Sequence, residues 1–437
     1  MLSSFFKLKE LGTTVKTEIM AGITTFLTMV YIVIVNPIIL HSAGVPFDTV
    51  FMATIIATVV GTLWMALLAN YPIAIAPGMG LNAYFAFSVV GNNTNIDYRI
   101  AFGAVFVAGI LFVILSLTPF REKLIESIPA NLKHGITAGI GLFIAFIGMR
   151  LTGIIVAHPE NLVGLGNLHS PTVLLALGGL AITLILMALN VNGALFFGMI
   201  ITGAIAYFTE QLKFDGFVAA PNLPKELFIF GDPITAFGDV FQYGLYAVVF
   251  SFLLVTIFDT TGTMVGVAEQ AGLMKGNKMT RARQALLADS VATTVGAAFG
   301  TSPTSAYIES SSGVAAGGRS GLTSVVVAIL FIAAAFFAPL VSAISGLAAI
   351  TAPTLIIVGS LMLGSLSKIN WNELDEAFPA FLIILTMPLT SSIATGIALG
   401  FISYPILKIV KGKYKEVPFL VYLFAVLFFY QLAFLPH

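Results

Sequence analysis

Apolar runs of membrane-spanning length recur along almost the whole chain, and this pattern limits the fold more than any other feature. A bilayer core about 30 Å thick takes roughly 20 helical residues to cross. The 437 residues are 58% hydrophobic and only 9% charged, whereas soluble domains carry about 25% charged residues. We therefore expect an all-α polytopic membrane protein embedded in the lipid bilayer, and a water-soluble fold is excluded.

Polar residues, glycine and proline divide the apolar sequence into fifteen runs. They cover residues 18–36, 49–69, 73–90, 99–118, 135–150, 171–189, 191–208, 241–266, 284–300, 303–317, 321–341, 347–366, 378–390, 391–407 and 417–435. A polar stretch that begins at Thr209 separates the first seven runs from the rest. The next seven correspond to the first seven, which predicts fourteen transmembrane segments, and the sequence leaves open whether 417–435 crosses, re-enters or lies along the surface.

The distribution of Lys and Arg predicts the orientation, because cytoplasmic loops hold these residues in excess. With the N-terminus inside, sixteen of them fall on the cytoplasmic side and only Arg99, Arg150, Lys213 and Lys225 fall outside. We therefore expect a multi-pass protein of the inner, cytoplasmic membrane with a cytoplasmic N-terminus. An odd number of spans in each half makes the halves enter the membrane from opposite sides, as an inverted repeat requires. The net charge of zero gives no reason to expect a nucleic-acid partner.

The third run of each half is interrupted in a similar way. Residues 71–87 read YPIAIAPGMGLNAYFAF and residues 299–315 read FGTSPTSAYIESSSGVA, each with a proline followed by small residues and then a polar side chain. Proline removes a backbone donor and Gly/Ser-rich sequence lowers helix propensity, so each segment should be extended first and helical afterwards. Such backbone is tolerated at membrane depth only where it is buried in protein or lines a cavity, and paired interruptions indicate a transport site.

Two acids lie deep in apolar runs, Asp259 in VTIFDTTGTMVG and Glu309 in TSAYIESSSG. Placing a charge there costs roughly 2.5 to 3.5 kcal/mol on insertion scales, which suggests a function. They are interpreted as facing a central cavity, holding a polar ligand by its ring N–H groups and taking up a proton. The structural alternative is a carboxyl that stays protonated or caps a broken helix. Three further acids near predicted span ends are weaker candidates: Glu18, Glu269 and Asp289.

Uncharged residues near these acids complete the predicted site. Asn82 offers a donor and an acceptor to a heterocycle, although Asn is also a favoured helix cap. Gly80 would let backbone approach a flat ligand, but glycine also serves helix packing in membranes. Aromatic rings that could stack on a ligand, or simply pack in the core, are Phe26, Tyr84, Phe258 and Tyr307.

Several chemistries are disfavoured by the residues present. The histidines (His41, His134, His158, His169 and His437) lie at span ends or in loops, and the chain has no cysteine. Proton coupling should therefore depend on carboxylates, and no metal site, cofactor motif or nucleophile elbow is found. An enzyme in the membrane is disfavoured for the same reason. A channel or anion exchanger on an inverted-repeat scaffold would want basic or hydroxyl-lined positions at mid-membrane, whereas here the deep charges are acidic.

Four motifs resemble those of the adenine/guanine/hypoxanthine permease branch of the nucleobase transporter superfamily, over essentially the whole chain. They are AGITTFLTMVYIVIVNP from Ala21, APGMGLNAYFAF from Ala76, FDTTGT from Phe258 and TSPTSAYIESSSGVAAGGRSGLTS from Thr301. The resemblance implies a seven-plus-seven inverted repeat with short strands in half-spanning segments 3 and 10. A core domain would comprise residues 1–134 and 241–342, a gate domain 135–208 and 343–437, and an extracytoplasmic connector 209–240.

The resemblance also implies a function. Relatives of this kind import purine bases by proton symport with an elevator-type movement, often as homodimers, and Asp259 and Glu309 match the acids that contact the base. Thr263 replaces a histidine that uracil permeases carry four residues after the first of these acids, which leaves the proton route open. We expect hypoxanthine or guanine as substrate, with adenine next, while the sequence leaves the preferred purine and the choice between proton and sodium undecided.

Overall fold

Helices dominate the computed structural model, which describes residues 2–91, 96–118, 128–213, 216–224, 226–275 and 278–434. The side chains of Leu2, Ala247, Phe258, Lys275, Lys278, Gln431 and Phe434 are outside the described part. Arg121, Lys123 and Lys225, which contributed to the predicted orientation, and His437 also lie outside it.

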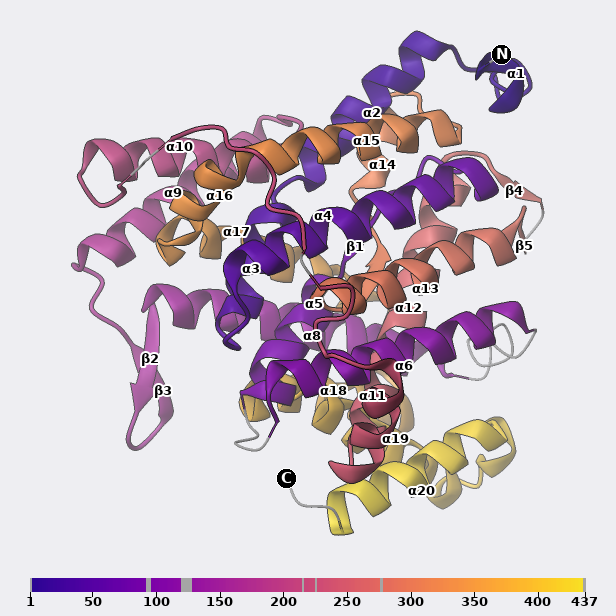
Figure 1. Cartoon of the computed structure of the whole chain (residues 1–437). Helices are drawn as coiled ribbons and strands as arrows, with labels where there is room; N and C mark the ends of the chain where they lie inside the picture. Colours follow the sequence, from indigo (N-terminus) through magenta and orange to yellow (C-terminus); the bar gives the residue numbers. More distant parts are fainter. Residues whose placement is uncertain are drawn as a thin grey trace.

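The elements of the first half run from the N-terminus to the start of the connector (Figure 1). They are α1 Leu2–Phe5, α2 Val15–Met29, α3 Ile32–His41, α4 Phe47–Trp64, a π-helical turn Met65–Ala69, β1 Ile75–Pro77, α5 Met79–Ala83, a π-helical segment Tyr84–Val90, α6 Tyr98–Leu117, α8 Ala130–Thr152, β2 Ile155–His158, β3 Leu162–Leu165, α9 Pro171–Ala188 and α10 Ala194–Phe208.

The second half begins with a helix inside the predicted connector. Its elements are α11 Pro233–Gln242, α12 Tyr246–Gln270, β4 Met274–Lys275, β5 Lys278–Met279, α13 Ala282–Phe299, β6 Thr304–Ala306, α14 Ser310–Ala315, α15 Gly321–Ala334, α16 Ala338–Ser345, α17 Ala348–Met362, α18 Leu374–Thr390, α19 Ile393–Val410 and α20 Phe419–Phe434, with 3-10 turns at Ala335–Phe337, Leu363–Lys368 and Tyr414–Glu416.

Polar residues cap several of these helices at their first turn. The side chains of Thr14, Ser170, Asp232, Ser320 and Ser392 each accept a hydrogen bond from a backbone N–H two or three residues further on. Such caps satisfy donors that a helix start leaves unpaired. The starts of these helices therefore follow directly from local sequence.

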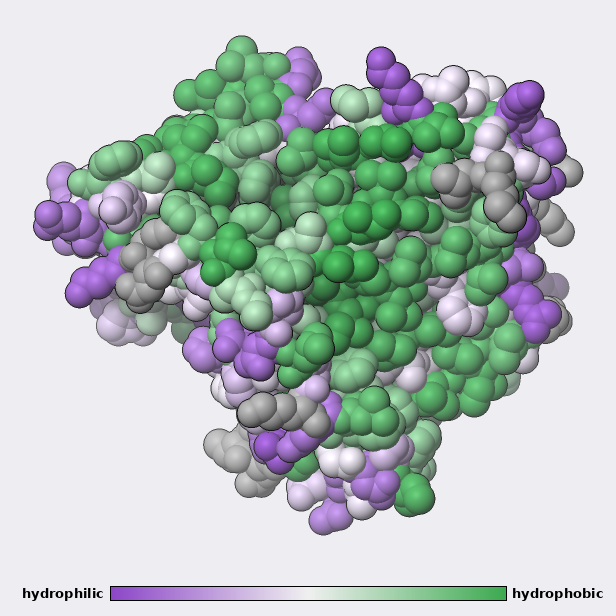
Figure 2. Space-filling view, turned by 45° about the horizontal axis from the view of Figure 1, so that its top comes forward, coloured by the Kyte–Doolittle hydropathy of each residue, from purple (hydrophilic) through white to green (hydrophobic). Residues whose placement is uncertain are grey.

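Nine helical stretches in the described residues are long and apolar enough to cross a membrane. They are Val15–His41, Phe47–Ala69, Tyr98–Leu117, Ala130–Thr152, Pro171–Ala188, Val248–Gln270, Gly321–Ser345, Ala348–Lys368 and Ile393–Val410. Met79–Val90, Ala194–Phe208 and Phe419–Tyr430 are shorter apolar helices. Figure 2 shows a broad hydrophobic face with hydrophilic residues gathered at its margins. The prediction of a helical, multi-pass membrane protein is confirmed, whereas the count of fourteen segments stays a prediction.

The helices pack in two groups. One group contains α2, α4, α6, α13 and α15, and the other contains α8, α9, α10, α17, α18 and α19. Glycine permits the closest approaches inside them: a Cβ on Gly141 of α8 would lie 2.6 Å from the carbonyl oxygen of Gly359 on α17. Small residues at such contacts let helix backbones approach where hydrophobic burial gives little driving force.

Glu18, one of the weaker candidate acids, caps a helix of the first group. Its carboxylate accepts hydrogen bonds from the backbone N–H groups of Arg319, Ser320 and Thr323 at 2.8, 3.2 and 3.2 Å, and from the Thr323 hydroxyl at 2.6 Å. An acid at a helix N-terminus is stabilised by the unpaired N–H groups and by the helix dipole. The structure thus gives Glu18 a role in joining α2 to α15.

Candidate functional site

Two short strands from opposite halves of the chain pair at the centre of the molecule (Figure 1). Strands β1 and β6 are antiparallel, with Ile75 opposite Ala306, Ala76 opposite Ser305 and Pro77 opposite Thr304. Two further backbone bonds extend the contact, from Gly78 N–H to the Pro303 carbonyl at 2.9 Å and from Tyr307 N–H to the Ala74 carbonyl at 3.0 Å. Backbone groups within a membrane must be paired internally, and here each segment pairs the other.

Each strand leads into a short helix, so both proline-containing segments are extended first and helical afterwards. Strand β1 precedes α5, and β6 precedes α14. Tyr307, at the end of β6, is 4% exposed and donates from its hydroxyl to the Pro77 carbonyl at 2.6 Å. This bond fixes the two strand ends to each other, so Tyr307 lies at the predicted site but its hydroxyl is occupied by backbone.

Glu309 lies directly before α14, as its N-cap residue, and is half-buried. Its Oε1 atom accepts a hydrogen bond of 2.6 Å from the hydroxyl of Tyr31. Tyr31 is 1% exposed and lies at the break between α2 and α3, inside the first apolar run. The carboxylate is therefore held by a residue between α2 and α3, and no feature of the sequence connects that residue with Glu309.

Asp259 lies in the long helix α12 and is also half-buried. The Ser305 hydroxyl on β6 lies within hydrogen-bonding reach of its carboxylate. Asp259 and Glu309, which we call the acid pair, are close enough for their charges to interact, and Tyr307 is close to both. No ion pair reaches either acid within the described residues. The acid pair thus presents hydrogen-bond acceptors that lie close to hydroxyl groups and have no cationic partner in the described part.

A third acid, Asp289, holds together the elements that carry Asp259 and its neighbour Ser305. Asp289 on α13 is fully buried and accepts hydrogen bonds from the Thr260 hydroxyl at 2.6 Å and the Thr304 hydroxyl at 2.8 Å. Thr260 follows Asp259 in α12 and also accepts from the Ala306 N–H at 3.3 Å. Asp289 therefore joins α12 to β6, next to the residues that carry Asp259 and its Ser305 partner.

Asn82 lies inside α5, whose N-cap is Gly78, so the capping interpretation of Asn82 is wrong. Its side chain is fully buried and donates to Asn36 Oδ1 at 3.0 Å, and Asn36 in turn donates to the hydroxyls of Thr54 and Thr301 at 2.7 and 2.8 Å. The Asn82 Oδ1 atom has no hydrogen-bond partner among the described residues. A buried acceptor without a partner costs about 1 to 3 kcal/mol, which is consistent with a ligand contact at this position.

The remaining predicted site residues lie as follows. A Cβ on Gly80 would lie 2.4 Å from Ile140 Cγ2, so Gly80 permits α5 to pack on α8. Thr263 is half-buried on α12, one turn beyond Asp259. The ring of Phe26 packs edge-on against Phe331, with centroids 5.2 Å apart. The side chain of Phe258 is outside the described part.

Tyr31, Asn36 and Ser305 are not predicted from the sequence to belong to the site, and Asp289 is only a weaker candidate. Tyr31 and Asn36 lie in the motif from Ala21, but nothing in that run distinguishes them from packing residues. Asp289 was placed near a span boundary, whereas α13 begins seven residues earlier and buries it completely. Its threonine partners are distant in the sequence, so only the fold reveals its position.

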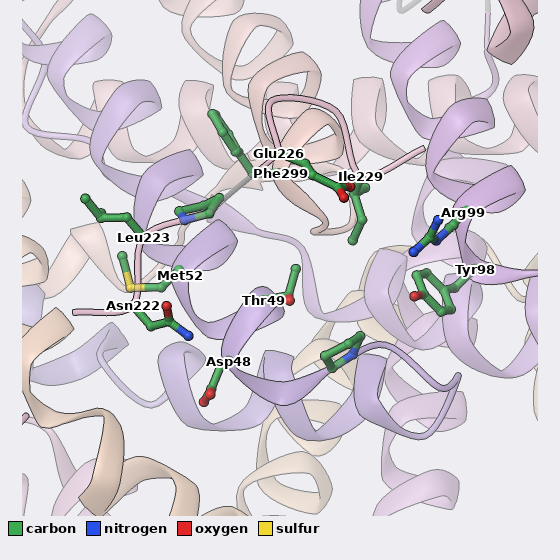
Figure 3. Close-up of a pocket in the computed structure, with 12 residues that line it drawn as sticks. Asp48, Thr49, Met52, Tyr98, Arg99, Asn222, Leu223, Glu226, Ile229 and Phe299 are labelled. Carbon is green, nitrogen blue, oxygen red and sulfur yellow. The ribbon is translucent and has the colours of Figure 1, made fainter. Parts of the chain in front are cut away.

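A pocket of about 260 Å³ lies apart from the acid pair (Figure 3). It is lined by Asp48 on α4, Arg99 on α6, Glu226 on the segment before α11 and Phe299 at the end of α13. Its lining includes none of the predicted site residues. In the described part of the chain no group of three or more His, Asp or Glu side chains is arranged to hold a metal ion.

Comparison with solved structures defines the class of fold as that of membrane transporters. The transmembrane domain of the cyanobacterial bicarbonate transporter BicA superposes with a TM-score of 0.64 and 15% identity, covering 87% of this chain and 96% of that one. SLC26A9 gives a TM-score of 0.66 at 12% identity, covering 94% of this chain and 68% of that one. At these identities the likeness concerns the fold alone.

The chain belongs to the Permease family (Xan_ur_permease), whose model matches residues 16–399. It is 70% identical to the guanine/hypoxanthine permease PbuO of Bacillus subtilis, over 98% of this chain and 99% of that protein. It is 44% identical to the adenine permease AdeP of Escherichia coli, over 100% of this chain and 96% of that protein. The family confirms the resemblance drawn from the motifs, and it confirms that the chain is a permease and not an enzyme.

Proposed function

We propose that this permease imports a purine base, hypoxanthine or guanine first and adenine next, by proton symport. The observation that carries the proposal is the acid pair beside the crossing strands, where the Tyr31 hydroxyl donates to Glu309 and no ion pair reaches either acid within the described residues. The relatives, which are guanine/hypoxanthine and adenine permeases, support the same substrate class.

The chemistry of the site matches the edge of a purine. Carboxylates accept hydrogen bonds, and purine bases carry ring N–H groups, with an exocyclic amine in guanine and adenine. A hydrogen bond to an ionised group contributes about 1.5 to 3 kcal/mol, so two such contacts would select an N–H-rich heterocycle. Asn82, with its Oδ1 atom unpartnered, would add a third acceptor. A proton on one acid of the pair would reduce their mutual repulsion, which links proton uptake to binding.

The transport mechanism that we propose is an elevator-type movement of a core domain against a gate domain. The two helix groups support this division, because the first group lies within the predicted core domain and the second almost entirely within the predicted gate domain. The two groups meet where Gly80 of α5 packs against α8. Fourteen segments in an inverted repeat are part of the proposal, as the β1–β6 pairing would join the equivalent segments of the two halves. We also propose a homodimer in the inner membrane.

The cytoplasmic N-terminus is likewise proposed. The N-terminal α1 and the β4–β5 hairpin lie at one end of the long helices in Figure 1, and the β2–β3 hairpin lies at the other. The positive residues of the sequence favour the first end as the cytoplasmic one. A cysteine introduced at Gly164 in the β2–β3 hairpin should react with an impermeant maleimide in intact cells, and one at Lys7 should not.

Uptake of radiolabelled hypoxanthine into cells that lack their own purine permeases tests the function. Unlabelled guanine, hypoxanthine, adenine, xanthine and uracil are added as competitors, with and without a protonophore and with sodium replaced by choline. We expect competition by guanine and hypoxanthine, loss of accumulation with the protonophore, and no effect of sodium removal. Uptake that no purine inhibits would contradict the substrate, and uptake that needs sodium would contradict proton coupling.

An anion exchanger is the alternative function, because solved structures of this fold include the bicarbonate transporter BicA and the murine anion transporter Slc26a9. Two neighbouring carboxylates repel an anion, so the acid pair argues against this function here. Proteoliposomes loaded with chloride or bicarbonate provide the test, and exchange of either anion without purine would favour the alternative.

A further inference from the structure

One oxygen of Glu309 is already occupied before any ligand arrives. The Tyr31 hydroxyl donates to Oε1 at 2.6 Å, from a side chain that is 1% exposed. The backbone of Tyr31 is fixed as well, because its carbonyl accepts the N–H groups of Ile34 at 3.0 Å and Val35 at 2.9 Å. A buried phenol on an anchored backbone has little freedom to leave the carboxylate.

Neighbouring hydroxyls have other partners. Tyr307 donates to the Pro77 carbonyl, and Thr28 donates to backbone carbonyls, with the shortest of these bonds, 2.8 Å, going to Thr25. Among the side chains that the structure describes, Tyr31 is therefore the one with a hydrogen bond to the Glu309 carboxylate. Each carboxylate oxygen has two acceptor positions in the plane of the carboxyl group, and the Tyr31 hydroxyl takes one of the two on Oε1.

We propose that Tyr31 is a specificity-determining residue: its hydroxyl occupies the acceptor position on Oε1 that a bidentate contact would use, and this restricts Glu309 to a single hydrogen bond with the substrate. The inference rests on the proposed function, since it concerns how the purine is held. Hypoxanthine carries one N–H on the edge that includes N1, whereas guanine carries N1–H and the adjacent 2-amino group. An unrestricted carboxylate would bind both groups of guanine in a bidentate manner. With that position on Oε1 occupied, Glu309 binds one N–H of either base, so the permease accepts both bases with similar affinity.

Tyr31→Phe tests the proposal, because it removes the hydroxyl and keeps the ring. KM and Vmax are measured separately for hypoxanthine and guanine. We expect the ratio of the hypoxanthine KM to the guanine KM to rise about tenfold, as Glu309 gains a second oxygen for the 2-amino group. A purely structural role would change both KM values by the same factor, and an unchanged ratio overturns the proposal.

The matched control is Tyr404→Phe. Tyr404 lies on α19, and its hydroxyl donates to Glu376 Oε1 at 3.2 Å. This variant therefore also removes a tyrosine–glutamate hydrogen bond, but one away from the acid pair. It should leave the KM ratio unchanged. Membrane abundance and thermal stability of both variants are measured on green fluorescent protein fusions by size-exclusion chromatography, so that a folding defect is seen directly.

A second measurement uses the unaltered protein and needs no variant to fold. Inhibition constants of guanine and hypoxanthine against labelled hypoxanthine should lie within about tenfold of each other, because a second charge-assisted hydrogen bond would add up to about 150-fold. A larger advantage for guanine overturns the role of Tyr31 while leaving purine transport intact. If neither base binds, the proposed function fails and this inference fails with it.

Discussion

Acids gather in two clusters of this molecule, and their partners differ. In the ionic cluster, formed by Glu373, Asp375, Glu376, Lys408, Lys411, Lys413 and Glu416, lysines neutralise the acids. Lys408 Nζ lies 3.1 Å from Asp375 and 2.7 Å from Glu376, with the Lys408 and Asp375 side chains 4% and 0% exposed. In the acid pair, Glu309 accepts a hydrogen bond from the Tyr31 hydroxyl, and no lysine or arginine pairs with either acid among the described residues.

The difference distinguishes acids that stabilise the fold from acids that can accept a proton or bind a ligand. A carboxylate paired with lysine stays ionised, and breaking such a buried pair leaves an uncompensated charge. At the edge of the ionic cluster, hydrogen bonds from Lys411 and Lys413 hold the pKa of Glu373 below its usual range. A carboxylate held by a hydroxyl keeps the ability to accept a proton or a ligand N–H. Changes to the acid pair should therefore alter transport, and changes to the ionic cluster should alter stability.

The largest effect is expected for Asp259→Asn and Glu309→Gln, which keep the shape of each side chain and remove its charge. Each should reduce labelled hypoxanthine uptake to background, since a charge-assisted hydrogen bond worth roughly 10- to 150-fold in affinity is lost together with a proton site. Melting temperature should stay within a few degrees of the unaltered protein. Normal uptake and binding in both variants would remove the acid pair from the proposed site.

Lys408→Met should have the next largest effect, on stability. It leaves Asp375 and Glu376 without their buried partner, at a cost of roughly 3 to 5 kcal/mol. The thermal melting of the fluorescent fusion should fall strongly, while uptake per correctly folded molecule is retained. Lys411→Met is the control, because Lys411 is 37% exposed and its loss should cost much less. Equal losses in the two variants would contradict the structural role given to Lys408.

Asp289→Asn should affect both transport and stability moderately. The amide oxygen can still accept a hydrogen bond from one of the two hydroxyls, Thr260 or Thr304. The amide NH2 group faces the other hydroxyl, so one hydrogen bond is lost, at a cost in stability of about 1 to 3 kcal/mol. Because those threonines position α12 and β6, we also expect a several-fold rise in KM with little change in Vmax. Substrate titrations in proteoliposomes measure the two parameters. A change in stability without any change in KM would limit Asp289 to packing.

The smallest effect is expected for Glu373→Gln at the exposed edge of the ionic cluster. Because the pKa of Glu373 is lowered, its contribution to stability is present at neutral pH and is lost only as the pH falls through that lowered value. The variant and the unaltered protein should therefore melt together in acid and differ slightly, if measurably, at pH 7. Salt should reduce that difference. A large difference that persists at high salt would contradict the expected screening.

The general class and the family could be predicted from the sequence, because hydropathy and long motifs are local properties. The two interrupted segments were also located correctly, since proline and small residues mark them. The partners of the acids could not be predicted. Tyr31 reaches Glu309 across 278 residues and Asp289 reaches Thr260 across 29, and neither contact leaves a periodic signal.

Lys408 shows a second limit of sequence reasoning. It was counted as one more positive residue in a cytoplasmic loop, yet it lies inside α19, 3% exposed and surrounded by acids. The charge statistics that predict orientation use only the position of a lysine along the chain. Whether its ammonium group meets water or carboxylates depends on how α18 and α19 pack, which is tertiary information.

The β1–β6 pairing has a consequence for how the protein is made. Pro77 and Tyr307 are bonded across 230 residues, so the first strand leaves the ribosome long before its partner exists. During that interval the backbone groups of residues 75–77 need a temporary partner, such as water in the insertion machinery or a chaperone. A chain truncated before residue 304 should be recognised as incomplete and degraded, because its centre has no closing strand.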